Sequence, residues 1–155
     1  MKSRPYDYLK YWRVISYFMK SKYNLKQAEL DMILFLYSEK YFSKDKFDEF
    51  DELLSWDVKR FEKLKKEGWI TVFRKRMGQR KALYELSFKA LRLVNSIYSK
   101  LNGEEIPTGE GNNQMFARNV CYTDKVYRNM IKEMNAFTKQ NRRESREQQQ
   151  HLSQK

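Results

Sequence analysis

The sequence has very few of the residues that build disulfide frameworks and metal sites. Its 155 residues include one cysteine, Cys121, and one histidine, His151. An internal disulfide needs a pair of cysteines, and a Cys/His zinc site needs about four such ligands, so both are excluded. Catalytic sets of the Ser-His-Asp or Cys-His kind are excluded as well, because His151 lies in a polar tail. We therefore expect no enzyme activity, no cofactor and no metal, with Cys121 packed as a small apolar side chain.

Long apolar runs are also missing. No stretch of about 18 apolar residues occurs that could span a membrane, and the N-terminus lacks the apolar core of a signal peptide. No glycine-rich phosphate-binding loop is present. These absences favour a cytoplasmic protein of the cell that makes or hosts it, with no membrane partner.

Positive charge is plentiful and unevenly distributed. The chain has 32 Lys and Arg residues against 20 Asp and Glu residues, a net charge of +12. Residues 56–81 hold ten positive and three negative residues, whereas residues 39–55 hold six negative and three positive ones. A local surplus of this kind favours a polyanionic partner, and nucleic acid is the first candidate. The acidic stretch lacks the turn glycine of a calcium loop, so we expect it to be a solvated helix face.

Hydrophobic spacing predicts a helical chain with one β-hairpin. The helices are expected over residues 5–22, 26–38, 44–54, 56–67, 88–101 and from about 123 to 141, with the hairpin at 69–86, a loop at 102–114 and a frayed or disordered polar tail at 142–155. The last helix is expected to bury Tyr122, Val126, Met130, Met134 and Phe137. The fold class is therefore mainly α with a small antiparallel β-wing, a winged helix-turn-helix spanning residues 1–101, followed by a C-terminal helical arm at 115–141.

Local signals for helix ends support these boundaries. A capping box is expected at Asn24 and Gln27, and serine caps are expected before the helices that start near residues 44, 56 and 88. These serines are Ser43, Ser55 and Ser87. Gly68 suits the position just past a helix end, and Gly78 suits the turn of the hairpin.

The basic residues fall on the two elements that are best suited to contact duplex DNA. A helix fits the major groove, and a neighbouring hairpin can reach phosphates with Arg and Lys. The helix 44–54 would support the recognition helix 56–67 without being basic itself. The candidate DNA-binding residues are Lys59, Arg60, Lys63 and Lys66 on the helix and Arg74, Lys75, Arg76, Arg80 and Lys81 on the hairpin. An ordinary helix with a solvated lysine face is the alternative.

Three segments resemble the MarR family of winged-helix regulators. They are LKKEGWI at 64–70, GQR at 78–80 and YELSFKA at 84–90. In that family the recognition helix is followed by Leu-x-x-x-Gly-Leu-Val, the wing carries Asp-x-Arg, and the next helix is entered through Leu-Thr-x-x-Gly. Asn24-Leu25 followed by the apolar helix 26–38 also resembles the family's second helix, so the resemblance covers about residues 5–101. The chain departs from the family pattern with Gly78 in place of the wing aspartate and Ala90 in place of glycine. Asp57 and Arg60 are further departures, because the family's recognition helix often has apolar residues at these positions.

The resemblance implies a role for several residues. Arg80 would be the wing arginine, and Lys59, Arg60 and Lys63 would be recognition-helix contacts. The family binds palindromic DNA as a homodimer formed by its terminal helices, so the helices at 5–22 and 122–140 would form a dimer here. The sequence names no small-molecule effector.

We therefore predict a sequence-specific, double-stranded DNA-binding transcriptional regulator. Two alternatives remain open. One is a replication or packaging factor with the same fold, and the other is a structural or adaptor protein, including a viral one, that uses the fold for protein contacts or for non-specific contacts with nucleic acid.

Overall fold

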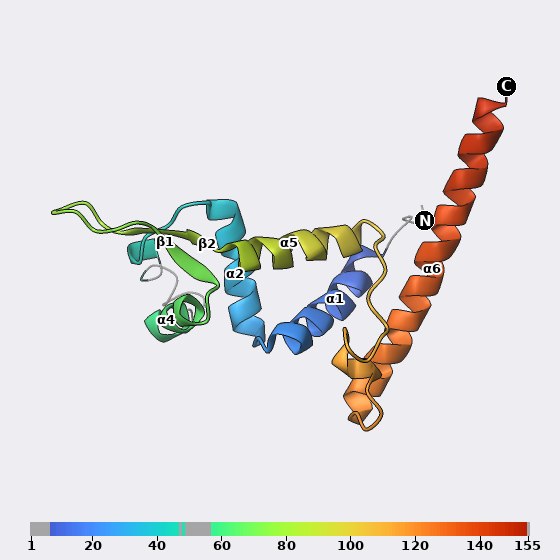
Figure 1. Ribbon diagram of the computed structural model, residues 1–155, viewed down its shortest axis with the longest axis horizontal. Coiled ribbons are helices and arrows are strands. Elements are labelled where there is room, and N and C mark those ends of the chain that lie inside the picture. The colour runs from blue at the N-terminus through green and yellow to red at the C-terminus, as the bar shows by residue number, and fades with distance from the viewer. Residues whose placement is uncertain (1–6, 47, 49–56, 155) are drawn as a thin grey trace. The chain divides into compact units, whose positions relative to one another are not determined.

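The computed structural model describes residues 7–46, 48 and 57–154. Over this part of the chain it is mainly helical, with one two-stranded antiparallel sheet, as the sequence predicts (Figure 1). Its elements are α1 (Tyr8–Tyr23), α2 (Gln27–Glu39), α4 (Val58–Lys66), β1 (Ile70–Arg74), β2 (Leu83–Leu86), α5 (Phe88–Leu101), the 3-10 helix η1 (Gln114–Phe116) and α6 (Tyr122–Ser153). The predicted helix 44–54 and its Ser55 neighbour lie largely outside the described residues.

The chain divides into two compact units. The central unit is Asn24–Ser96, and the terminal unit combines Met1–Tyr23 with Ile97–Lys155. The sequence prediction grouped the first helix with residues up to 101, whereas the structure groups α1 with α6.

The core of the central unit is built around Phe61 of α4. Phe61 is fully buried and meets the rings of Phe42 and Tyr84 edge to face, with centroid distances of 6.4 and 5.0 Å. The backbone of Phe42 pairs with that of Tyr84 through two hydrogen bonds of 3.0 and 2.8 Å. Other buried side chains of the central unit lie on α2, at the entry to β1 and on α5, and they include Leu30, Ile33, Trp69, Ile70, Leu93 and Val94. α4 and the sheet therefore share one apolar core.

The hairpin has the expected antiparallel pairing and turn. Ile70 pairs with Leu86 and Val72 with Tyr84, and the register shifts between Val72 and Arg74. Near the tip, Met77 and Arg80 exchange backbone hydrogen bonds of 3.0 and 3.1 Å around Gly78, whose φ is +58°. Gly78 thus supplies the left-handed turn position that the sequence predicts.

Two other local predictions are confirmed at the ends of helices. Gly68 has a φ of +82°, and the Trp69 N–H that follows it donates to the Leu64 carbonyl at 2.9 Å, so α4 ends just before this glycine. The Ser87 hydroxyl accepts a hydrogen bond from the Ala90 N–H at 3.3 Å at the start of α5.

Two other helices are capped by residues other than the predicted ones. α2 is capped at Lys26, whose N–H donates to the Glu29 carboxylate at 2.9 Å, while Asn24 has a φ of +52° in the turn before it. Asparagine tolerates this left-handed conformation, which explains its presence without a capping role. α4 begins at Val58 and not at residue 56, because the Asp57 carboxylate accepts from the Arg60 N–H at 2.8 Å and forms the cap.

The terminal unit is held together by contacts between α1 and α6 and by a loop on α6. Tyr17 stacks on Tyr127 at 3.8 Å and donates to Asp124 at 2.5 Å, and burial together with this bond raises the pKa of Tyr17. Asn135 donates to the Ile106 carbonyl and accepts from the Ile106 N–H, both at 2.9 Å. The loop after α5 is thereby attached to α6.

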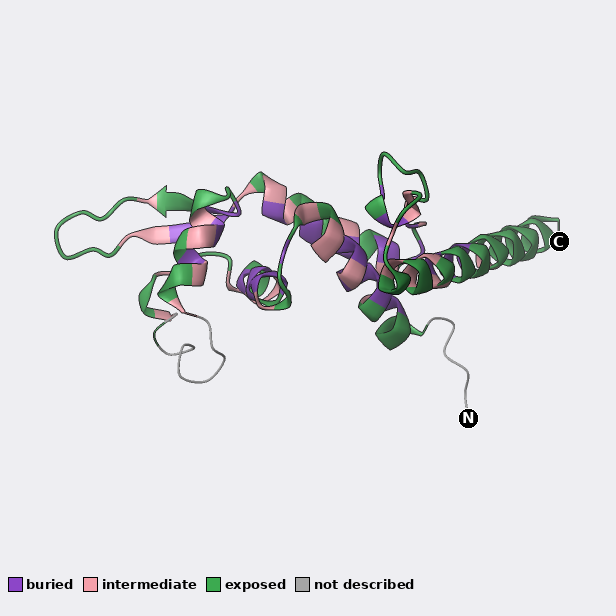
Figure 2. Cartoon of the chain, turned by 90° about the horizontal axis from the view of Figure 1, so that it is seen from below, coloured by how far each residue is buried: buried purple, intermediate pink, exposed green. Residues whose placement is uncertain are grey.

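Three predictions about this unit are corrected. α6 buries Ile131, Met134, Asn135 and Thr138. Met134 is buried as predicted, whereas Tyr122, Val126 and Phe137 are exposed, so the buried face is rotated away from the predicted stripe. The helix continues to Ser153 with residues 142–153 exposed, where a frayed or disordered tail is predicted (Figure 2). Cys121 is exposed at the N-cap of α6 and is not an apolar filler.

Candidate nucleic-acid interface

The outer face of α4 is set by its two buried side chains. Phe61 and Leu64 are the buried residues of this helix. Lys59 and Lys66 are seven residues apart, so both project from the side opposite Phe61 and Leu64, and both are exposed. α4 contacts β1 and lies beside the hairpin in Figure 1. The exposed lysines of α4 therefore belong to the same unit as the hairpin.

The hairpin exposes most of its positive charge near the tip. Lys75, Arg76, Arg80 and Lys81 are exposed. The Arg76 guanidinium donates to the Gly78 carbonyl at 3.4 Å, which keeps this side chain beside the turn. Arg74 differs, because it is half-buried and its guanidinium donates across the stem to the Lys81 carbonyl at 3.3 Å. Arg74 therefore closes the stem, and the other four are the side chains that a ligand can reach.

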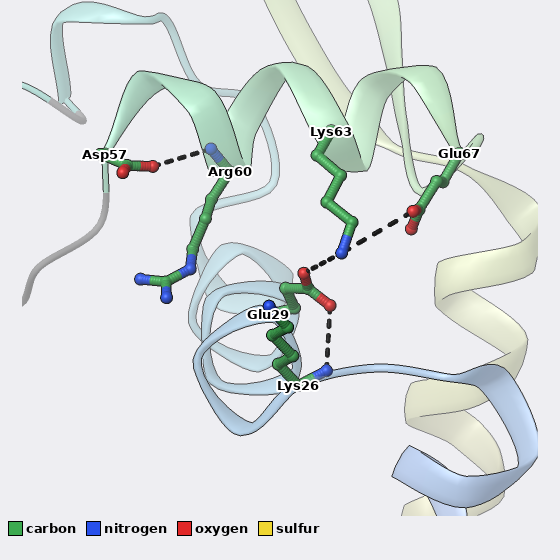
Figure 3. Close-up of polar contacts among 6 residues, drawn as sticks. All are labelled: Lys26, Glu29, Asp57, Arg60, Lys63 and Glu67. Carbon is green, nitrogen blue, oxygen red and sulfur yellow. Dashed lines mark hydrogen bonds and ion pairs between the residues drawn. The ribbon is translucent and has the colours of Figure 1, made fainter.

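Among the described residues, the basic side chains of this region that form intramolecular ion pairs include Lys81, Lys44 and Lys63. Lys81 pairs with Asp45, and Lys44 pairs with Glu62 on the outer face of α4. The Lys63 ammonium lies 2.5 Å from the Glu29 carboxylate of α2 and 3.9 Å from Glu67 (Figure 3). Arg60 leaves α4 on the same side as Lys63 in this view. All nine predicted DNA-binding residues belong to the central unit. They differ in exposure and in whether they form intramolecular ion pairs.

Sequence reasoning missed two groups that hold this region together. Lys89 lies 4.0 Å above the Trp69 ring and donates at 3.2 Å to the Glu67 carbonyl, at the negative end of the α4 dipole. Glu29 is the second group, a carboxylate that is only 1% exposed. Glu29 lies three residues after the cap of an apolar helix, a position from which its capping role could have been predicted. Its pairing with Lys63, which is 34 residues away, could not have been predicted from the sequence.

The Glu29 carboxylate should make the central unit sensitive to acid. Burial alone would raise its pKa, but the bonds from Lys63 and from the Lys26 N–H outweigh burial and hold the pKa below its ordinary value of 4.5. A carboxylate whose pKa is lower in the folded state contributes stability above its unfolded pKa, and that stability is lost as the pH falls through the folded pKa. We expect the free energy of unfolding to fall below about pH 4.5 for the wild-type protein and to fall less for Glu29→Gln.

Urea unfolding at a series of pH values measures this effect. Asp31→Asn is the matched control, because Asp31 is an exposed carboxylate on the same helix. Its pH profile should follow that of the wild type. Equal profiles for wild type and Glu29→Gln would contradict the prediction.

A hollow lies beside the basic hairpin in the part of the chain that the structure describes. The hollow has a volume of about 370 Å³ and is lined by residues that include Lys44, Arg76, Lys81 and Tyr84. Within the described ranges, no group of three or more His, Cys, Asp or Glu side chains is placed to hold a metal ion. Nor does any helix in that part of the chain have the length and apolar content needed to cross a bilayer.

Two features thus come together on the central unit: a short helix with exposed lysines, and a hairpin with an exposed basic tip. Comparison of the chain with protein-family models, curated proteins and solved structures gave no match.

Proposed function

We propose that the central unit is a winged helix that binds duplex DNA, and that the protein is a MarR-like transcriptional regulator. In this proposal α4 enters the major groove, and the β1–β2 hairpin acts as the wing that contacts phosphates. The observation that carries the proposal is the placement of Lys59 and Lys66 on α4 and of Lys75, Arg76 and Arg80 on the adjoining hairpin, all exposed on one compact unit.

The short distance along the chain between the two elements supports a joint role. α4 ends at Lys66 and β1 starts at Ile70, with Gly68 making the sharp turn between them. Trp69 and Ile70 are buried and secure this turn to the core that Phe61 shares. A helix and a hairpin fixed in this way keep a constant spacing, as simultaneous contact with a groove and its flanking phosphates requires.

We further propose that two copies assemble through the terminal unit. Tyr122, Val126 and Phe137 of α6 and Leu9 of α1 are exposed apolar side chains, and burying them in a dimer would remove apolar surface from water. A two-fold dimer would read a palindromic site.

Selection of bound duplexes from a random pool tests the function, with the molar mass measured in parallel. We expect enrichment of a shared palindromic sequence and a dimeric molar mass. The logarithm of the duplex-binding constant should fall linearly with the logarithm of salt concentration between about 50 and 200 mM. Binding to a single strand of the same length serves as the control and should be weaker. No enrichment, or equal binding of single strand and duplex, would favour the replication, packaging or adaptor alternatives over a regulator.

A further inference from the structure

We propose that Lys63 is a positioning residue that fixes α4 against α2 and does not bind the nucleic acid, so that the lysine contacts of α4 are left to Lys59 and Lys66. This inference rests on the proposed function. It gives Lys63 a different role from Lys59, although the sequence analysis predicts DNA contacts for both. Lys63 follows Lys59 by four residues, so both start from neighbouring positions on the helix surface.

The surroundings of Glu29 supply the first argument. One carboxylate oxygen accepts from the Lys26 N–H at 2.9 Å, and the other accepts from the Lys63 ammonium at 2.5 Å (Figure 3). Because Glu29 is 1% exposed, water cannot readily replace either donor. Lys63 thus connects α4 to the first turn of α2.

The cost of moving Lys63 is the second argument. If its ammonium moved to a DNA phosphate, Glu29 would remain as a buried carboxylate without its ion-pair partner, a state that is unfavourable. The new ion pair between Lys63 and the phosphate would be exposed and screened by salt. The exchange is therefore unfavourable, and the Lys63–Glu29 pair should persist when DNA is bound.

Lys81 and Asp45 provide an internal comparison. Their side chains are 68% and 53% exposed, so both groups remain solvated when the pair separates. An exposed pair of this kind contributes little stability. A phosphate can therefore replace Asp45, and Lys81 remains available to DNA although it is paired in the free protein.

The test compares the same substitution at three lysines: Lys59→Gln, Lys66→Gln and Lys63→Gln. For the first two we expect the slope of log affinity against log salt to become shallower by about 0.9 each, since each substitution removes one cation that neutralises the charge of the bound DNA. For Lys63→Gln we expect an unchanged slope and a lower thermal midpoint of unfolding. A slope change at Lys63 equal to that at Lys59 would overturn the proposal.

A double-mutant cycle tests the positioning role without DNA. We expect Glu29→Gln and Lys63→Gln together to destabilise the protein less than the sum of the two single variants, because each single variant leaves the other partner unpaired. Additive effects would overturn the positioning role. If the wild type shows no salt-dependent duplex binding, the proposed function fails, whereas the cycle still decides whether Lys63 holds α4 to α2.

Discussion

Replacing Lys75, Arg76 and Arg80 together with glutamine is expected to reduce the salt slope of duplex binding by about 2.7, and to weaken binding at every salt concentration in the linear range. All three side chains are exposed near the tip of the hairpin, and removal of one cation from a phosphate lowers the slope by about 0.9. The fold should persist, because exposed substitutions of this kind change stability by about 0.5 kcal/mol or less. Fluorescence anisotropy with a labelled duplex at several salt concentrations measures the slope.

A charge-matched control separates the wing from the total charge of the protein. Lys125, Lys132 and Arg143 are exposed basic residues of α6, and their replacement with glutamine removes the same net charge. We expect this variant to keep the wild-type slope. If both triple variants lose slope equally, the chain binds through its overall charge, and the hairpin has no special role.

Phe61→Ala is expected to lower the free energy of unfolding by about 3–5 kcal/mol. Phe61 is 1% exposed and packs edge to face on both Phe42 and Tyr84, so its removal leaves a cavity at the centre of the core. Such a loss is a large share of the roughly 5–15 kcal/mol that stabilises a typical domain. Because α4 is attached to the unit through Phe61 and Leu64, duplex binding should be lost in parallel.

Urea unfolding followed by circular dichroism measures the Phe61 effect. Val58→Ala on the same helix is the control, since Val58 is exposed and its substitution should cost well under about 1 kcal/mol. Phe61→Leu should fall between the two variants, because it fills part of the cavity. A loss of less than about 1 kcal/mol for Phe61→Ala would show that the core closes over the missing ring.

The features that could be predicted from the sequence are those fixed by neighbours in the chain. Gly68, Gly78 and Ser87 each act through a turn or a hydrogen bond within a few residues, and the hairpin follows from the β-forming residues on either side of Gly78. The helical class and the small sheet were predictable for the same reason.

Features that depend on distant contacts could not be predicted. The buried face of α6 is determined by α1 and by the loop that Asn135 binds, and the hydrophobic spacing alone favoured a neighbouring stripe. Asp57 and Ser55 are both good caps, so composition could not decide between them. The candidate site shows the same limit, because the ion pairs Lys63–Glu29 and Lys81–Asp45 join residues more than 30 positions apart.

Asn135 limits which amino acids can occupy its position in α6. Its side-chain amide offers one donor and one acceptor in the arrangement of a peptide group, and the Ile106 backbone uses both. Aspartate has the same shape but lacks the donor, so it would leave the Ile106 carbonyl without a partner in a buried place. Leucine would leave the Ile106 N–H without a hydrogen-bond partner as well. Glutamine has both the donor and the acceptor, but its side chain is longer by one methylene group. Asparagine at this position therefore satisfies both backbone groups of Ile106 from within a helix.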